Sequence, residues 1–388
     1  MTSADGDSMK ILFTLHDEIT PDAGGMGVTA GLAKVYRESG HEVESLSFGQ
    51  LPQRLPFRAK ALLFPEFAAW YLSRTDAEVV DAANGDAWVF GHLRRRLRGA
   101  QRPLLVSRSH GIVHTADLAR REEAARGGLE LSWKYPLYWG GWRLKEVADS
   151  FRLADLCLFL NDHEHAFAVE RLGVAAERAH VVDNGIPDDL LGLPLELGTE
   201  EDPVRIAHIG SYLPLKGVRY AAAALNEILE RWPDVTVSFL GPGCRPERVL
   251  ADFPRAVHRR IAVVPKYRRE ELRDLLAGHS AVVTATLKEG FPLGLLEAMA
   301  CGLTVVTAAT PGPLQYVRDG DNGLVVPRAD APAMAAALER LIADPPLLRR
   351  LRESAHATAQ RYSWKRIAPE TLRLYEEAMA SRASVPPR

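Results

Sequence analysis

The chain has 388 residues, of which 47% are hydrophobic and 25% are charged, and its formal net charge at pH 7 is −2. This length predicts two or three domains, and the composition is typical of a protein with ordinary hydrophobic cores. The near-neutral charge argues against a nucleic-acid partner, and no apolar run approaches the roughly 18 residues that a membrane-spanning helix needs.

Short β-branched or apolar runs alternate with helical segments along the first half of the chain. Helices are expected at Val28–Ser39 and Ala166–Leu172, and Asn161 is suited to cap the second of them. This alternation predicts a mostly parallel sheet covered by helices. The expected strands are Lys10–Leu15, Glu42–Phe48, Trp88–Gly91, Leu104–Arg108, Leu156–Leu160 and His180–Val182.

An acidic, turn-rich segment at residues 187–203 separates this half from a second run of strands and helices, which closes with a helix at Ala368–Met379. The α/β pattern therefore predicts two Rossmann-like domains, at residues 1–190 and 204–365, followed by a helix and tail at 366–388. Ligands of such sheets bind beyond the carboxyl ends of the strands. The strands expected in the second domain are Arg205–Ile209, Thr236–Leu240, Ala262–Val264, Val282–Ala285, Thr304–Thr307 and Leu324–Val326.

The most informative stretch is residues 288–302, where Glu289 and Glu297 stand eight positions apart around the start of a helix. Gly290 and Pro292 break the preceding strand, so Glu289 is expected in the loop and Glu297 on the helix. The free amides of the first helical turn favour an anion such as a diphosphate. Each carboxylate can accept two hydroxyl hydrogen bonds, which suits a hexose at Glu289 and a ribose at Glu297.

This stretch resembles the retaining glycosyltransferases of family 4, which have the GT-B fold. The similarity includes Glu289-Gly-Phe-Pro, Glu297-Ala-Met-Ala and the run from Gly320 to Val326, and it extends over most of the chain. It implies two Rossmann-like domains that face each other across a cleft, with an acceptor-binding first domain, a nucleotide-sugar-binding second domain and a last helix that crosses back. The implied donor-binding residues are Gly24, Gly25, Ser211, Lys216, Glu289, Gly290, Phe291, Pro292, Leu293 and Glu297.

The same resemblance implies a retaining, hexosyltransferase-type enzyme that uses a UDP- or GDP-linked sugar and no cofactor. His110, Lys216 and Glu289 are the implied catalytic residues, and the leaving diphosphate helps to deprotonate the acceptor hydroxyl in a front-side attack. Two positions depart from the family. Ser211 stands where many members have Arg, so Lys216 would carry most of the diphosphate charge, and Pro187 displaces the acid that usually follows the link between domains.

Three other functions are alternatives to sugar transfer for this sequence. Residues 25–30 fit Gly-x-Gly-x-x-Ala, a pattern of nicotinamide dehydrogenases, but residues 16–24 separate them from the first strand, which that fingerprint does not allow. A sugar-nucleotide epimerase shares the architecture but needs an acid–base pair that the first domain does not obviously supply. A binder of sugar nucleotides without activity is the third alternative.

The acceptor is left open as a small molecule, a glycan or a lipid-linked compound. The aromatic residues of 133–142 and 55–71 suit either an acceptor surface or a domain core. No spacing of histidines matches a metal motif, and Cys157, Cys244 and Cys301 are expected to be buried thiols. Residues 1–8 do not resemble a secretory signal, which favours a cytoplasmic protein and leaves peripheral contact with a membrane open.

Overall fold

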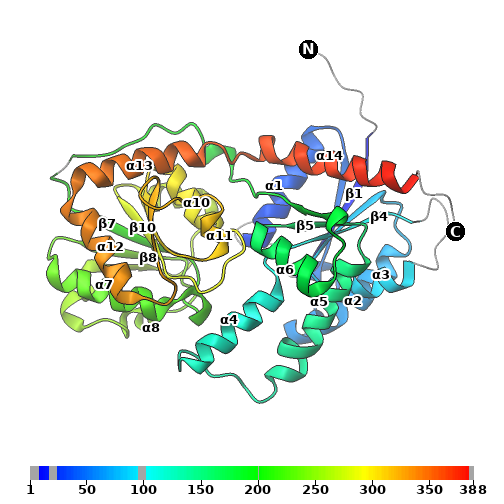
Figure 1. Ribbon diagram of the computed structural model, residues 1–388, viewed down its shortest axis with the longest axis horizontal. Coiled ribbons are helices and arrows are strands. Elements are labelled where there is room, and N and C mark those ends of the chain that lie inside the picture. Colours follow the sequence, from blue (N-terminus) through cyan, green and yellow to red (C-terminus); the bar gives the residue numbers. More distant parts are fainter. Residues whose placement is uncertain (1–7, 17–23, 95–101, 200, 384–388) are drawn as a thin grey trace, which may run out of the picture. The chain divides into compact units, whose positions relative to one another are not determined.

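A computed structural model describes residues 8–16, 24–94, 102–199 and 201–383. It contains two compact units, each built around its own sheet (Figure 1). Unit 1 comprises the described residues within Met1–His114, Trp133–Gly185 and Trp364–Arg388, and unit 2 comprises those within Thr115–Ser132 and Ile186–Ser363.

The sheet of unit 1 has six parallel strands in the order β2-β1-β3-β4-β5-β6. Five of the six predicted strands are confirmed, with ends that differ by one residue at most. The strands are β1 (Lys10–Leu15), β2 (Glu42–Ser47), β3 (Val79–Ala83), β4 (Leu104–Arg108), β5 (Leu156–Phe159) and β6 (Ala179–Val181).

The predicted strand at Trp88–Gly91 is wrong. These residues belong to helix α3 (Trp88–Leu93), and the strand that pairs with β1 and β4 is Val79–Ala83. The central residue of this strand is Asp81, which is 1% exposed and bonds to the Arg108 guanidinium at 2.7 Å. Arg108 neutralises the charge and makes its burial tolerable, whereas a short apolar run such as Trp88–Gly91 fits a buried helix equally well.

Helices cover both faces of the unit 1 sheet. Figure 1 shows α14 and α1 above the strands and α2, α3 and α5 below them, and α1 packs against α14 while α3 packs against both α2 and α5. The helix α6 is capped as predicted, because Asn161 Oδ1 accepts from the Glu164 amide at 2.9 Å. The helices are α1 (Gly24–Glu38), α2 (Phe57–Leu72), α3, α5 (Arg143–Leu153), α6 (Asp162–Leu172) and α14 (Trp364–Ala383).

Unit 2 repeats the architecture, with six parallel strands in the order β12-β11-β10-β7-β8-β9. All six predicted strands are confirmed to within one residue at either end. The strands are β7 (Arg205–Ile209), β8 (Thr236–Leu240), β9 (Ile261–Val264), β10 (Ala281–Thr284), β11 (Thr304–Ala308) and β12 (Gly323–Val326).

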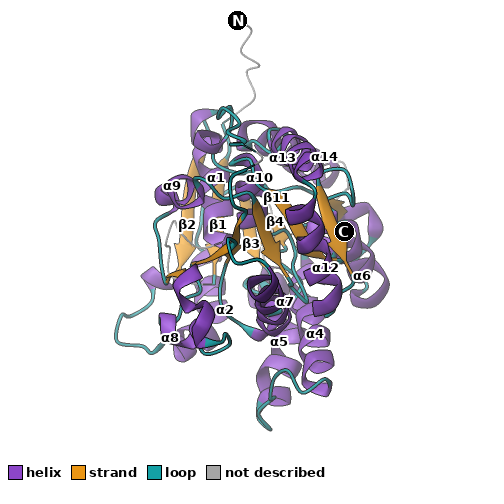
Figure 2. Cartoon of the chain, turned by 90° about the vertical axis from the view of Figure 1, so that its left-hand side faces the viewer, coloured by secondary structure: helices purple, strands orange, loops and turns teal. Residues whose placement is uncertain are grey.

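The helices of unit 2 also form two layers, since α10 packs against α13 and α7 packs against α12. The second layer covers a continuous core that includes Leu225, Ile228, Phe239 and Leu338. Figure 2 colours these helices purple around the orange strands. The helices are α7 (Val218–Arg231), α8 (Pro246–Leu250), α9 (Leu272–Leu276), α10 (Leu293–Ala300), α11 (Pro311–Leu314), α12 (Ala331–Ala343) and α13 (Pro345–Ala359).

The segment Thr115–Ser132 belongs to unit 2, although in the sequence it lies between two parts of unit 1. It contains most of helix α4 (Val113–Ala125). Glu123 on this helix is 1% exposed, and its carboxylate lies 2.8 Å from Nε of Arg219 on α7. The Tyr220 hydroxyl adds a hydrogen bond at 3.0 Å. A buried carboxylate needs such partners, and they attach the segment to unit 2.

No helix in the described ranges is long and apolar enough to cross a membrane. The three cysteines are free; Cys157 is buried as predicted, whereas Cys244 and Cys301 are half-buried.

Candidate functional site

The predicted donor residues of unit 2 lie where the strand order reverses. After β7 the chain adds β8 and β9 on one side of it, then returns to place β10 on the other side. Loops that leave the carboxyl ends of two such neighbouring strands diverge, and the space between them is the usual ligand crevice of an open α/β sheet. Ser211 and Lys216 follow β7, and Glu289 follows β10, so the three residues flank this point.

The ammonium of Lys216 lies 2.5 Å from Oε2 of Glu289. Lys216 ends the short helix η8 (Pro214–Lys216) and its side chain is 35% exposed, while that of Glu289 is 20% exposed. The Thr286 hydroxyl lies 3.4 Å from the same carboxylate oxygen. Both charged groups are therefore held in place while each keeps some contact with solvent.

Close backbone packing brings these two loops together. The amide of Leu287 donates to the carbonyl of Leu215 at 2.9 Å, and the Thr286 hydroxyl donates to the same carbonyl at 3.3 Å. Gly217 has a φ of +67° and lies so close to the Ala285 carbonyl that an added Cβ would be 1.8 Å from its oxygen. Only glycine fits this position, for both conformational and steric reasons.

Glu297 lies on α10 and is paired with Arg269, whose Nη2 donates to Oε1 of the carboxylate. Glu297 is 6% exposed. Arg269 begins the short helix η10 (Arg269–Glu271) beyond β9. Arg269 is not among the residues predicted from the sequence, where Lys216 is the cation expected at the donor site. The signal was available, because Arg269 follows the carboxyl end of a strand in the same sheet.

The loop that carries Glu289 rests on an aromatic cluster. The ring of Phe291 lies 5.2 Å from that of Tyr316 and 6.0 Å from that of Tyr362, and the two tyrosines are 5.8 Å apart. The Tyr316 hydroxyl donates to the Pro292 carbonyl at 2.7 Å. These contacts fix the residues just before the helix, and Leu293 is the first residue of α10, as the motif predicts.

The amino end of α10 points into the same region with its first amides available. Pro292 precedes the helix and, among the described residues, no side chain caps it. An added Cβ on Gly294 would lie 2.9 Å from Ile209 Cγ2, so the helix start lies close against the end of β7. Two carboxylates, two cations and a helix amino terminus thus belong to loops and a helix at the carboxyl edge of the unit 2 sheet, a combination that can bind an anion between two hydroxyl-bearing groups.

In unit 1, His110 is the second residue after β4 and is half-buried. Its amide lies 3.4 Å from Asn84 Oδ1. Burial, with the Arg108 charge adding to it, lowers the pKa of His110 to about 4. The imidazole is therefore neutral at pH 7, and it can donate or accept a hydrogen bond but does not supply a positive charge.

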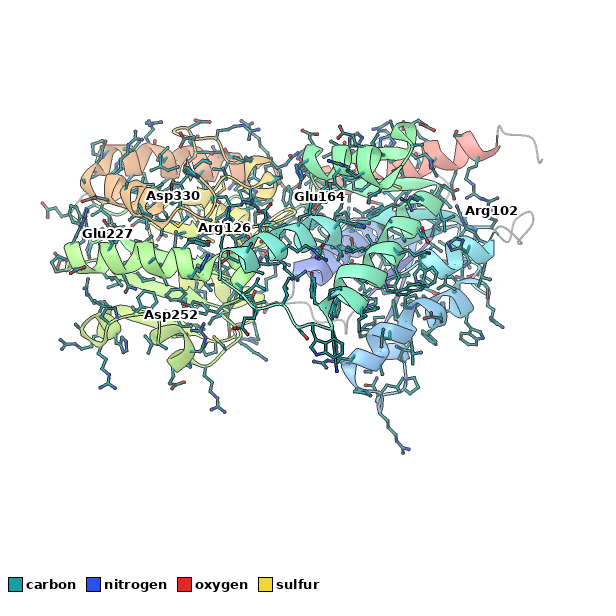
Figure 3. All side chains as sticks on the ribbon, turned by 60° about the horizontal axis from the view of Figure 1, so that its bottom comes forward. Arg102, Arg126, Glu164, Glu227, Asp252 and Asp330 are labelled. Atoms are coloured by element: carbon teal, nitrogen blue, oxygen red, sulfur yellow. The ribbon has the colours of Figure 1, made fainter. Side chains whose placement is uncertain are left out.

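The turn around His110 is built on Glu164 of α6, which Figure 3 labels. The Ser109 hydroxyl donates to Glu164 Oε2 at 2.7 Å, and the Ile112 amide donates to Oε1 at 3.0 Å. Gly111 has a φ of +106° and its amide donates to the Ser109 hydroxyl at 3.0 Å. These bonds fix the backbone on both sides of His110, which is what a positioned functional histidine requires.

Comparisons with known proteins identify the family of this chain. A sequence model of the family described as glycosyl transferases group 1 matches residues 203–344, which include every predicted donor residue of unit 2. The MMP alpha-(1->4)-mannosyltransferase of Mycolicibacterium hassiacum is 30% identical over 289 residues, which are 73% of this chain and 67% of that protein. The chain belongs to the glycosyl transferases of group 1.

Other comparisons extend this assignment without defining the substrates. The D-inositol 3-phosphate glycosyltransferase of Streptomyces bingchenggensis is 30% identical over 243 residues, 58% of this chain and 53% of that protein. The chain spans rather more than half the length of the first curated relatives that it matches. Sucrose-phosphate synthase of Thermosynechococcus elongatus superposes with a TM-score of 0.78 at 19% identity, over 96% of this chain and 100% of that chain.

The predicted α/β fold is confirmed, because each unit is Rossmann-like and the solved structure of a GT-B glycosyltransferase matches nearly the whole chain. Two of the donor-binding residues implied for this group 1 member, Gly24 and Gly25, belong to unit 1. Gly24 and Gly25 are the first two residues of α1, which begins before the expected Val28. Helix amides near two glycines still suit a close approach of a ligand to the backbone.

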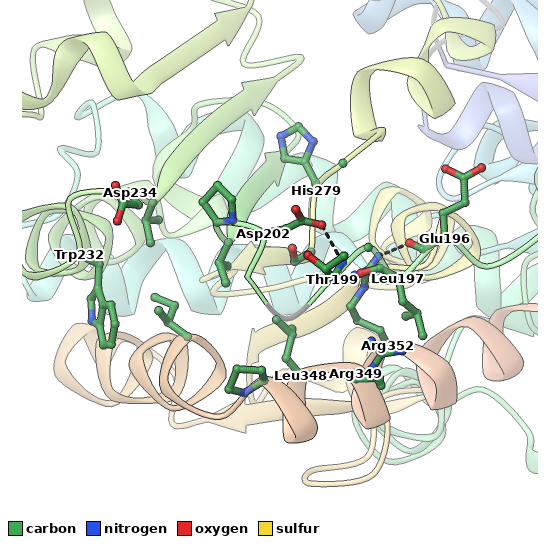
Figure 4. Close-up of a pocket in the computed structure, with 18 of the residues that line it drawn as sticks. Glu196, Leu197, Thr199, Asp202, Trp232, Asp234, His279, Leu348, Arg349 and Arg352 are labelled. Atoms are coloured by element: carbon green, nitrogen blue, oxygen red, sulfur yellow. Dashed lines mark hydrogen bonds between the residues drawn. The ribbon is translucent and has the colours of Figure 1, made fainter.

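A hollow of about 400 Å³ in unit 2 lies away from the residues predicted to bind the donor (Figure 4). Its lining includes Val204, Val235 and Ser280, which precede β7, β8 and β10, so it lies at the amino ends of the strands. Arg352 donates to the backbone carbonyls of Glu196 and Leu197 beside it. The predicted donor residues lie at the opposite edge of the sheet, and this hollow is therefore separate from them.

Proposed function

We propose that this protein transfers a sugar from a nucleoside-diphosphate sugar to an acceptor hydroxyl with retention of the anomeric configuration. The observation that carries the proposal is the arrangement at the reversal of the strand order. Glu289 and Glu297 lie before and on α10, each beside a cation, within the part of the chain that matches the family. A nucleoside-diphosphate sugar carries a hexose, a diphosphate and a ribose in a row. Its two hydroxyl-bearing ends can therefore bind the two carboxylates while its charged centre binds the cations.

Each residue then has a separate role toward the donor. Glu289 accepts hydroxyl hydrogen bonds from the hexose and Glu297 accepts them from the ribose. Lys216 and the first amides of α10 stabilise the negative charge that develops on the leaving diphosphate. The Lys216 ammonium has three donors, so it can bind a phosphate oxygen and still keep its bond to Glu289.

Arg269 has a positioning role in this scheme. Its bond to Oε1 of Glu297 fixes the carboxylate and leaves Oε2 to accept from a ribose hydroxyl. In a crevice where Ser211 replaces the family's usual Arg, Arg269 also adds positive charge near the nucleotide. His110 contacts the sugar as a neutral hydrogen-bonding group, and Gly24 and Gly25 let the ligand approach the backbone closely. The proposal uses no cofactor and no metal.

For the acceptor we propose only a chemical class, and for the location only a cellular compartment. A glycan, a small molecule or a lipid-linked compound each offers the hydroxyl that the reaction needs, and a nucleic acid is not expected. A cytoplasmic location with peripheral membrane contact remains the prediction for this chain. Membership of the glycosyl transferases speaks against the dehydrogenase and the epimerase considered from the sequence.

A thermal-shift panel of UDP, GDP, ADP and dTDP sugars, with NAD as the control, tests the proposal. A ligand that binds only the folded state raises stability by mass action, by about 2.7 kcal/mol at a hundred times its Kd. We expect one sugar nucleotide to raise the Tm and to be slowly hydrolysed, with equal rates in the presence and absence of EDTA. A shift with NAD and none with any sugar nucleotide would overturn the proposal.

A further inference from the structure

Unit 1 exposes a cluster of large apolar side chains. Among the described residues, twelve large hydrophobic side chains are exposed, and eight of them come from α2 and from the segment Trp133–Trp142. We call these two segments the aromatic face. Isolated exposed apolar residues are common, whereas several on neighbouring elements at one side of a domain indicate a surface that binds something apolar. The eight are Phe57, Leu62, Leu63, Trp70, Trp133, Leu137, Trp139 and Trp142.

These residues answer a question that the sequence left open. The aromatic stretch at 133–142 was equally consistent with a core and with a surface, and the structure places three of its tryptophans on the surface. Trp133 is 78% exposed, Trp139 49% and Trp142 48%. The second stretch is divided, because Phe64 and Ala68 of α2 are buried while Leu62 and Trp70 are 51% and 54% exposed.

The two segments lie on the same side of the unit 1 sheet. Helix α3 packs against both α2 and α5, and α5 continues directly from Trp142. The Trp142 ring lies edge-on to Trp88 of α3 at 5.9 Å. Figure 1 shows α2, α3 and α5 together below the strands, and Figure 3, which turns that side forward, shows side chains projecting along α2.

Cations accompany the exposed tryptophans. The Arg74 guanidinium lies 4.7 Å from the Trp70 ring centroid, the Lys134 ammonium 5.3 Å from that of Trp133, and the Lys145 ammonium 5.5 Å from that of Trp142. An indole beside a cation suits the boundary between lipid chains and headgroups, because the ring enters the apolar layer while the charge stays near phosphate.

The charge of the aromatic face also differs from that of the whole protein. Residues 54–74 contain one acidic side chain, Glu66, and residues 133–145 contain none. Exposed Arg54, Arg58 and Arg74 lie in the first range and exposed Lys134 lies in the second, whereas the charge of Lys145 is paired with Asp149 of α5 at 2.7 Å. Each exposed cation near an anionic leaflet contributes about 1 kcal/mol of attraction. The chain as a whole has a formal net charge of −2, so the excess is local.

We propose that the aromatic face docks unit 1 on the surface of an anionic phospholipid bilayer. The apolar side chains supply hydrophobic burial and the flanking cations supply attraction to phosphate headgroups, the two contributions that a peripheral protein combines. A second copy of this chain fits less well, because a symmetric contact would bring the two sets of cations together. The bilayer is therefore the occupant whose chemistry complements both features.

Docking there places the membrane near one edge of the unit 1 sheet. Trp133–Trp142 precedes α5, which leads to the amino end of β5, so the segment lies at the carboxyl edge where His110 also lies. A lipid-borne acceptor would present its headgroup at this edge. This last step rests on the proposed transferase function, whereas the docking itself does not.

Vesicle co-sedimentation of the full chain tests the docking. The probes are vesicles of phosphatidylcholine alone and vesicles with roughly one third phosphatidylglycerol. We expect sedimentation with the anionic vesicles, little with the neutral ones, and a decrease as salt screens the headgroups. Tryptophan fluorescence should shift to shorter wavelength on binding, because exposed indoles leave water.

Paired variants locate the contact. Leu62→Ser with Trp70→Ser, and separately Trp133→Ser with Trp139→Ser, should each weaken partitioning about tenfold or more, and Arg54→Glu with Arg58→Glu should abolish the preference for anionic vesicles. Leu118→Ser is the matched control, since Leu118 of α4 is 50% exposed and lies outside the aromatic face. Each exposed substitution should leave the Tm nearly unchanged, which separates lost docking from misfolding.

Three results would overturn the docking proposal. The first is that the chain does not sediment with anionic vesicles at low salt. The second is that Leu118→Ser weakens vesicle binding as much as the variants of the aromatic face do. The third is that light scattering shows a dimer of the unchanged protein that the variants of the aromatic face do not form. The donor thermal shift, measured without vesicles, tests the transferase separately. Vesicle binding without a donor shift would refute the function alone, and a donor shift without vesicle binding would refute the docking alone.

Discussion

The Lys216 ammonium lies 2.5 Å from Oε2 of Glu289, across the point where the strand order of unit 2 reverses. The cation proposed for the diphosphate is thus bonded to the carboxylate proposed for the hexose. A change at either residue alters the orientation of the other, so the two should be tested together as well as singly. Their coupling is measurable by a double-mutant cycle.

Lys216→Ala should weaken binding of the free nucleoside diphosphate at least about tenfold, because a hydrogen bond to a charged group contributes roughly 1.5–3 kcal/mol. Titration calorimetry measures the affinity. Lys34→Ala, at an exposed lysine of α1, is the control and should bind as the unchanged protein does. Unaltered affinity in Lys216→Ala would mean that the diphosphate binds elsewhere.

Glu297→Ala should weaken binding of both the nucleoside diphosphate and the sugar conjugate, whereas Glu289→Ala should weaken only the conjugate. The reason is that the two carboxylates are assigned to opposite ends of the donor. Arg269→Gln should weaken binding of both ligands, but less than Glu297→Ala does, because the Glu297 carboxylate loses the partner that positions it. Parallel calorimetric titrations with both ligands measure the difference, and equal losses in all three variants would contradict the division of roles.

Gly217→Ala should destabilise the protein by clearly more than Gly243→Ala. Both glycines have positive φ, +67° and +69°, so both substitutions carry a similar backbone penalty of about 1 kcal/mol. An added Cβ at Gly217 meets the Ala285 oxygen at 1.8 Å, whereas nothing lies within 4 Å of one at Gly243. Urea unfolding measures the difference, and equal losses would show that the loop moves aside freely.

The second half of the chain was predictable because its local signals agree. Each strand of unit 2 is a short apolar run, and a glycine or proline with a helix start follows β10, so the positions of Glu289 and Glu297 followed from pattern alone. The bond between Lys216 and Glu289 did not follow. It joins residues that are 73 positions apart and depends on how two loops pack, which periodicity does not encode.

The first half was less predictable where charge is buried. Asp81 interrupts the apolar pattern of β3, and its partners Arg108 and Tyr375 are distant in the sequence. A strand that depends on such partners has no local signature. The exposure of the tryptophans at 133–142 could not be deduced either, because an aromatic run has the same composition on a surface as in a core.

Tyr375→Phe should lower the free energy of unfolding by about 1–3 kcal/mol, because it leaves the buried Asp81 carboxylate with one donor fewer. The Arg108 guanidinium also loses a partner, since its Nη2 lies 3.1 Å from the Tyr375 hydroxyl. Tyr71→Phe, at a half-buried tyrosine of α2, is the control. Chemical unfolding measures both variants, and an unaffected Tyr375→Phe would mean that water replaces the hydroxyl.

Buried histidines should make this protein less stable in mild acid. Burial lowers the pKa of His208 and of His279 to about 4, below the usual 6.5, and their side chains are 2% and 3% exposed. Between pH 6.5 and pH 4 the unfolded chain binds protons at these positions and the folded chain does not. The free energy of unfolding therefore falls as the pH falls through this window, and these groups have little effect above it.

Chemical unfolding at pH 7, 6 and 5 should show this loss, with each histidine contributing up to about 1.4 kcal/mol per pH unit below pH 6.5. His208→Leu removes one titrating group next to Phe239, so it should make the pH dependence shallower by that share. His163→Leu, at an exposed histidine of α6, should leave the slope unchanged. The same slope in His208→Leu as in the unchanged protein would show that His208 is protonated in the folded chain or reaches solvent before the chain unfolds.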